Sequence, residues 1–74
     1  MKGITIDKLY EMCKKQKALG NGKKKILMTS DDEGNRYHQA WFGLEDGNDC
    51  KDYIQMGQLC ATESKNLSDY VILA

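Results

Sequence analysis

The sequence has no proline, only one histidine and no long run of apolar residues. No stretch approaches the roughly 20 apolar residues that a membrane-spanning helix needs, so we expect no membrane partner. The absence of proline leaves no sign of a rigid linker. A chain of 74 residues is also near the lower size limit for one self-sufficient core. We therefore expect a single domain over residues 1–74.

The sequence also lacks a net charge, because eleven Lys and Arg balance eleven Asp and Glu. A general nucleic-acid binder is usually clearly basic, so we do not expect general nucleic-acid binding. The charges are segregated along the chain, however. A cluster of lysines predicts a local basic patch, which consists of Lys14, Lys15, Lys17, Lys23 and Lys24.

Cysteine is scarce and odd in number, with Cys13, Cys50 and Cys60 far apart in the sequence. This pattern, with no secretory signal at the start, is typical of reduced thiols in a cytosol rather than of a disulfide framework. The three thiols and His38 are acceptable zinc ligands, but no CxxC pair is present. We expect neither a metal nor a cofactor.

The first predicted element is a helix over residues 6–19. Thr5 has the side chain of an N-cap, and apolar residues recur at the 3/4 spacing of one helical face. Gly20 and its neighbours end the pattern, since they tolerate the left-handed conformation of a C-cap.

Extended segments follow at residues 26–29, 36–44 and 70–73, with loops at 45–49 and 61–68. The turn formers of 31–35 join the first two strands into a hairpin. Asp49 is a candidate cap for a short helix within 50–59, which Gly57 would end. The sequence thus predicts an α+β fold, in which the N-terminal helix packs on a small, mainly antiparallel sheet of about three strands.

Both faces of this predicted sheet are apolar, because side chains of a strand alternate between faces. The long helix covers one face only. Either residues 50–60 complete the core, or a second copy or a ligand covers the other face. The small size of the chain favours a homo-oligomer.

Two groups of residues are candidate binding sites. Lysines beside aromatic side chains suit a nucleotide, because the ring stacks on the base while the ammonium groups hold phosphate. The candidate ligand-binding residues are Lys23, Lys24, Tyr37, His38 and Trp41. The acidic run Asp31, Asp32 and Glu33 is an alternative partner-binding site. Its spacing does not fit an EF-hand, and a hairpin turn explains it more simply.

His38 is also the one candidate general base of a small hydrolase. No nucleophile accompanies it at a recognisable spacing, so we expect a non-enzymatic protein without catalytic residues.

The run from Ser30 to His38, S-D-D-E-G-N-R-Y-H, is followed closely by Trp41 and Phe42. It resembles a group of small uncharacterised proteins of bacteriophages and prophages. The resemblance implies a phage protein in the cytoplasm of a bacterial host, where such proteins often counter host defence. In one form of this function, an oligomer of the protein sequesters a nucleotide immune signal. The alternatives are an inhibitor that binds a host defence protein through its acidic hairpin tip, and a small assembly or accessory protein.

Overall fold

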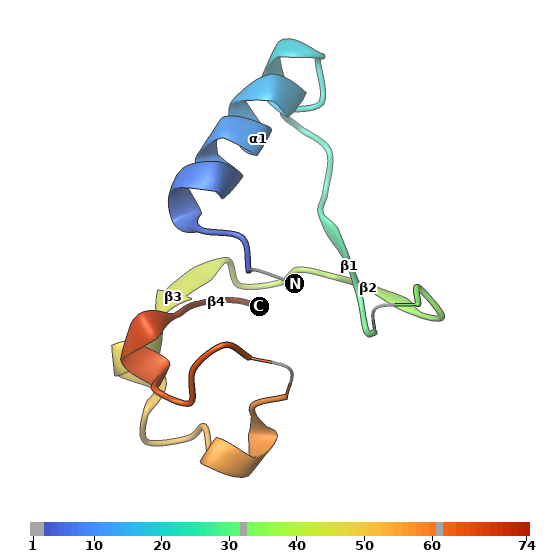
Figure 1. Cartoon of the computed structure of the whole chain (residues 1–74). Coiled ribbons are helices and arrows are strands. Elements are labelled where there is room, and N and C mark those ends of the chain that lie inside the picture. Colours follow the sequence, from blue (N-terminus) through green and yellow to red (C-terminus); the bar gives the residue numbers. More distant parts are fainter. Residues whose placement is uncertain (1–2, 32, 61) are drawn as a thin grey trace.

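The computed structural model describes residues 3–31, 33–60 and 62–74. One α-helix and four strands are joined in part by 3₁₀ helices (Figure 1). They are α1 (Ile6–Ala18), β1 (Leu27–Thr29), β2 (Tyr37–Gln39), β3 (Leu44–Asp46), η1 (Gly47–Cys50), η2 (Met56–Gln58), η3 (Leu67–Asp69) and β4 (Val71–Leu73). The α+β class is confirmed. Within the described residues, no helix has the length and apolar character needed to cross a bilayer.

Helix α1 begins and ends close to the predicted positions. The hydroxyl of Thr5 accepts a hydrogen bond from the amide of Lys8 at 3.1 Å, as an N-cap requires. Leu19 caps the other end, and Gly20 then takes a positive φ of 90°. The local signals therefore predicted the helix to within one residue.

The strands form two separate sheets, so the predicted single sheet of three strands is wrong. β1 pairs with β2 as the expected hairpin, and β3 pairs with β4. The predicted strand 36–44 is interrupted after β2. Gly43 has a φ of 101°, and the amides of Phe42 and Gly43 both donate to the carbonyl of Ala74. These bonds turn the chain away from the hairpin and into the second sheet.

The segment predicted as a loop over 45–49, followed by a candidate short helix within 50–59, is organised differently. Asp46 caps η1 by accepting from the amide of Asn48, so the predicted cap at Asp49 is wrong. No α-helix forms in 50–59, and Gly57 lies inside η2 instead of ending a helix. The predicted loop 61–68 contains the start of η3, and its residue 61 lies outside the described residues.

We define the C-terminal lobe as residues 44–60 and 62–74. A small core holds this lobe together. Cys50 of η1 is 1% exposed and Leu67 of η3 is 8% exposed. The backbones meet beside them, where the amide of Gly47 donates to the carbonyl of Tyr70 at 2.8 Å. The Tyr70 hydroxyl in turn accepts from the amide of Ser64 at 2.7 Å. Residues far apart in the sequence thus form the best-buried part of the protein.

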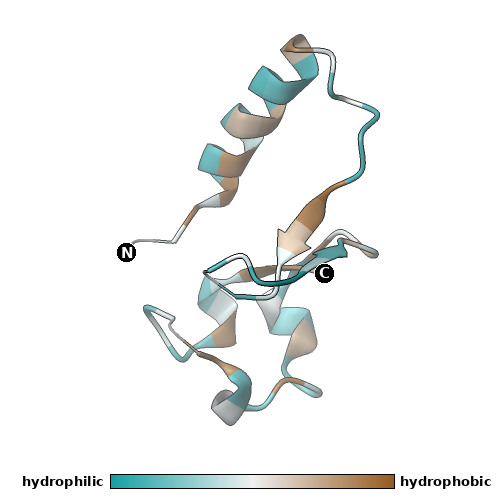
Figure 2. Cartoon of the chain, turned by 90° about the vertical axis from the view of Figure 1, so that its right-hand side faces the viewer, coloured by the Kyte–Doolittle hydropathy of each residue, from teal (hydrophilic) through white to brown (hydrophobic). Residues whose placement is uncertain are grey.

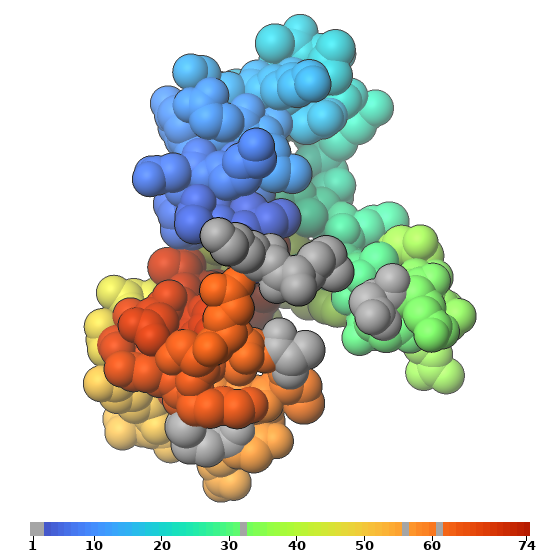
Figure 3. All heavy atoms as spheres, viewed as in Figure 1, coloured from blue at the N-terminus to red at the C-terminus, as the bar shows by residue number. Residues whose placement is uncertain are grey.

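Helix α1 and the β1–β2 hairpin project from this lobe and bury little surface (Figures 1 and 3). No residue of α1 is buried, so the helix does not cover a sheet face as expected. The chain exposes 6794 Å², whereas a compact monomer of 8.4 kDa exposes about 4,600 Å². Its radius of gyration of 13.7 Å also exceeds the ~11 Å of a compact chain of this length. The fold is open.

Candidate ligand-binding groove

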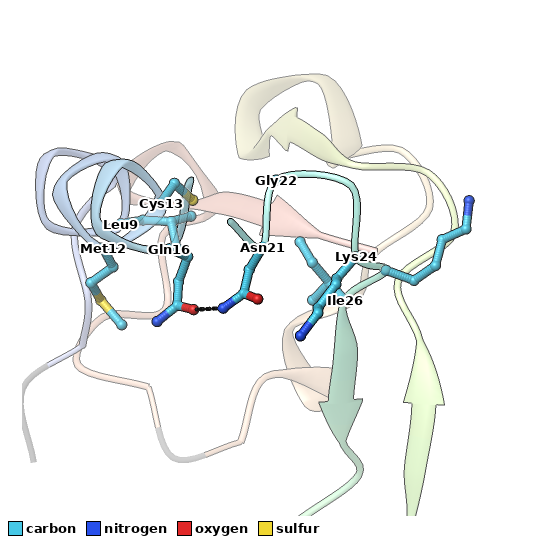
Figure 4. Close-up of a pocket in the computed structure, with 9 residues that line it drawn as sticks. Leu9, Met12, Cys13, Gln16, Asn21, Gly22, Lys24 and Ile26 are labelled. Atoms are coloured by element: carbon cyan, nitrogen blue, oxygen red, sulfur yellow. Dashed lines mark hydrogen bonds between the residues drawn. The ribbon is translucent and has the colours of Figure 1, made fainter. Parts of the chain in front are cut away.

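A groove of about 440 Å³ lies between α1 and the segment that returns from its C-terminal end toward β1 (Figure 4). The apolar side chains of its walls are Leu9, Met12 and Cys13 from the helix and Ile26 from the returning segment. Figure 2 shows hydrophobic residues along α1 and again in β1, with a hydrophilic segment between them. The groove has the size and the apolar walls of a small-molecule site.

Polar groups close one end of this groove. The side-chain amide of Asn21 donates to Oε1 of Gln16 at 2.8 Å, which ties the turn to the helix (Figure 4). Gly20 and Asn21 carry the chain through this turn, where the amide of Asn21 also donates to the Gln16 carbonyl. The spacing between helix and returning segment is therefore set by hydrogen bonds at its closed end.

Two lysines of the returning segment add positive charge to one wall of the groove. Lys24 and Lys25 belong to its lining, and the aliphatic part of Lys17 lies against Gly22. In the part of the chain that the structure describes, the one ion pair joins Glu11 and Lys14 at 4.0 Å. The lysines at the groove thus face solvent without a carboxylate among the described residues, and they are ready to hold an anion.

The five predicted ligand-binding residues do not share one pocket within a single chain. Lys24 lines the groove, and Lys23 precedes it as an exposed residue. Tyr37 and His38 are neighbours in β2, so their side chains leave opposite faces of the hairpin. Trp41 follows the hairpin and is 69% exposed. The aromatic half of the predicted site therefore lies outside the described lining of the groove.

The walls of the groove were missed by the sequence analysis. The spacing of Leu9 and Cys13 predicted one apolar face of a helix, and Ile26 was assigned to the start of the predicted strand 26–29. Their position on both sides of the turn at Gly20–Gly22 was the available signal.

The carboxylates of the acidic hairpin tip accept hydrogen bonds from within their own turn. Asp31 accepts from the amides of Glu33 and Asn35, each at 3.1 Å, and Asn35 Nδ2 donates to carboxylate oxygens of both Asp31 and Glu33. The hydrogen bond from the Asn35 amide is the main reason that the pKa of Asp31 is lowered. Asp32 lies outside the described residues. The described carboxylates stabilise a turn, which is the simpler of the two interpretations given above.

His38 makes a local contact only. Its Nδ1 lies 3.2 Å from the backbone carbonyl of Gln39, and the residue is exposed. Among the described residues, no group of three or more His, Cys, Asp or Glu is close enough to hold a metal ion. The four predicted zinc-ligand candidates, Cys13, Cys50, Cys60 and His38, are thus not brought together.

One polar cluster in the C-terminal lobe brings together a phenol, a carboxylate and a thiol. The Tyr53 hydroxyl donates to Oε2 of Glu45 at 2.9 Å and lies 3.1 Å from Sγ of Cys50. The Cys50 thiol donates to the same carboxylate at 3.4 Å. The contact with Cys50, followed by that with Glu45, raises the pKa of Tyr53 well above its ordinary value.

We expect the phenol of Tyr53 to ionise above pH 10, its ordinary midpoint being about 10. Because the pKa of Tyr53 is higher in the folded than in the unfolded chain, the protonated phenol stabilises the fold. This contribution is fully present below pH ~10 and is lost as the pH rises through the folded-state pKa. The measurement is the alkaline absorbance titration of the wild type minus that of Tyr53→Phe. Glu45→Gln should lower the midpoint, and a midpoint at or below 10 in the wild type would contradict the assignment.

Comparisons of the chain with protein-family models, with curated proteins and with solved structures found no match.

Proposed function

We propose that this chain is a non-enzymatic binding protein of a phage, which counters host defence by sequestering a nucleotide signal. The carrying observation is the apolar groove between α1 and the returning segment, with Lys24 and Lys25 in its lining. The phage context comes from the resemblance of the hairpin motif alone. An oligomer in the cytoplasm of the bacterial host is part of this proposal.

The groove supplies the two kinds of contact that a nucleotide needs. Apolar walls accept the flat face of a base, and they lose less free energy to desolvation than polar walls do. Lysine ammonium groups at the edge hold phosphate oxygens as mobile point charges. A ligand with one apolar ring and at least one phosphate therefore fits this groove better than a neutral sugar or a cation.

The charge distribution extends this argument beyond the groove. Residues 1–25 contain eight lysines and two acidic residues, whereas residues 26–74 contain three basic and nine acidic residues. The N-terminal part thus has a net charge of +6 and the remainder −6. Such a field draws a phosphate ligand toward the helix side of the molecule and away from the C-terminal lobe.

The hairpin tip gives less support to the alternative function, in which the chain inhibits a host defence protein, than the groove gives to nucleotide binding. Asp31 and Glu33 already accept hydrogen bonds from within the turn, so a host protein would have to compete for these oxygens. We therefore favour the groove over the tip.

The test is binding of ADP and of a cyclic dinucleotide, followed through tryptophan fluorescence, because Trp41 is the only tryptophan. We expect saturable binding and a loss of about tenfold or more in affinity for Lys24→Ala, since a charge-assisted phosphate contact is lost. Isothermal titration calorimetry provides a second readout that does not depend on the position of Trp41.

Lys51→Ala is the matched control, because Lys51 is an exposed lysine of the C-terminal lobe, outside the groove lining. It should bind like the wild type. No binding of either nucleotide, or equal losses in the two variants, would overturn the nucleotide form of the proposal. Native mass spectrometry of protein purified gently from bacteria then identifies any retained ligand.

A further inference from the structure

We infer that the groove is completed by a second copy of this chain, whose Trp41–Phe42 pair inserts into it, in a reciprocal dimer. This deepens the proposed function, on which the nucleotide part of the inference rests, while the dimer itself stands on the three observations below. The partner copy would then contribute the aromatic side chain that the groove lacks within one chain.

The first observation is the amount of uncovered surface. The chain exposes 6794 Å², about 2,200 Å² more than a compact monomer of its mass. Obligate homodimers bury roughly 1,000–2,500 Å² on each partner. The excess thus corresponds to the share of one subunit in such a dimer, and the unburied α1 accounts for part of it.

The second observation is the aromatic pair itself. Phe42 is 86% exposed, the highest value among the large hydrophobic residues that the structure describes, and its neighbour Trp41 is 69% exposed. The backbone below them is fixed, because the amides of Phe42 and Gly43 donate to the Ala74 carbonyl at 2.7 and 2.8 Å. Aromatic side chains that project from a hydrogen-bonded backbone are suited to anchor a protein interface.

The third observation is charge. The pair is followed directly by β3 and η1, whose sequence from 44 to 50 contains three acidic residues and no basic one. The groove lies in the part of the chain with a net charge of +6. Docking the pair of one copy into the groove of another brings opposite charges together, and a two-fold axis repeats the contact in the reverse direction.

Such a dimer unites residues that a single chain separates. Lys24 of one copy and Trp41 of its partner would then line one site, in which a base lies between the indole and the apolar wall of the groove while the lysine holds phosphate. A nucleotide bound there contacts both subunits and links binding to association.

The test traps the contact by a disulfide. Phe42→Cys is made in a Cys60→Ser background, so that Cys13 in the groove is the exposed native thiol, and it is oxidised at a protein concentration high enough to offset the loss of the anchor side chain. We expect oxidised glutathione to give a covalent dimer in which peptide mapping finds positions 13 and 42 linked, since a disulfide needs Cα atoms within about 7 Å. Tyr37→Cys in the same background is the matched control. Tyr37 is 62% exposed but lies on the hairpin, and it should not link to Cys13.

Sedimentation of the unmodified protein across the micromolar range is the second measurement. We expect a dimer, and we expect Phe42→Asp to raise its dissociation constant about 30-fold or more, as loss of an anchor residue does. Phe42 is too exposed within one chain for this change to unfold it. A monomeric wild type, or linkage from both positions alike, overturns the inference. A monomer that still binds nucleotide refutes the dimer alone, and a trapped dimer that binds none refutes the proposed function alone.

Discussion

Gly47→Ala should unfold most of the protein at room temperature. A Cβ atom at this position would come within 1.9 Å of the carbonyl oxygen of Leu67 and 2.6 Å of that of Tyr70. Both are backbone atoms, so neither moves aside without displacing η3. We expect the free energy of unfolding to fall by about 3 kcal/mol or more, because overpacking against backbone is poorly relieved. A domain of this size has only about 3–5 kcal/mol to lose.

Gly57→Ala is the control for this experiment. A Cβ atom at Gly57 would meet nothing within 4 Å, and the residue is not among the glycines with positive φ. Its free energy of unfolding should stay within about 0.5 kcal/mol of the wild type or rise slightly, as the unfolded chain loses freedom. Urea unfolding followed by circular dichroism measures both variants. Equal stabilities would show that η1 and η3 do not pack as described.

Leu67→Ala should lower the free energy of unfolding by about 2–3 kcal/mol. Leu67 is one of two hydrophobic side chains that the described residues bury, the other being Cys50. It also borders an apolar pocket of about 360 Å³ in the C-terminal lobe. The shortened side chain enlarges an existing space, so we expect the lower half of the usual 2–5 kcal/mol range.

Leu27→Ala removes the same atoms from β1, where the side chain is 63% exposed. Little apolar area returns to water there, so we expect a change of about 0.5 kcal/mol. Chemical denaturation of the two variants gives the comparison directly. A cost at Leu27 equal to that at Leu67 would mean that the hairpin, and not the C-terminal lobe, carries the stability of the fold.

The parts of the fold predicted correctly are those with local causes. Thr5 and Gly20 act within a turn of the helix ends, and Gly34, with a φ of 73°, acts within the hairpin turn. In the C-terminal lobe, local caps such as Asp46 start single 3₁₀ turns, but the packing of these turns depends on contacts between distant positions. Cys50 and Leu67 are 17 positions apart, and Gly47 is needed only because the Leu67 carbonyl approaches it. No residue pattern around Gly47 predicts that the Leu67 backbone comes this close.

The candidate site was predicted to a smaller extent. Lys24 was found because a lysine cluster is visible in any sequence, and it does line the groove. The apolar walls were not found, since the helical spacing of Leu9 and Cys13 is the same for a covered and an uncovered helix face. Whether an apolar stripe meets a partner within its own chain depends on tertiary contacts, and those for α1 are few.

The two sheets close over loops of very different length, which gives the chain an order of assembly. Only residues 30–36 separate β1 from β2, whereas residues 47–70 separate β3 from β4. On a ribosome, the hairpin can form soon after it emerges, but β3 waits for the whole intervening segment before its partner arrives. Throughout that interval, and also in the finished chain, where none of its residues is buried, helix α1 leaves its apolar stripe uncovered.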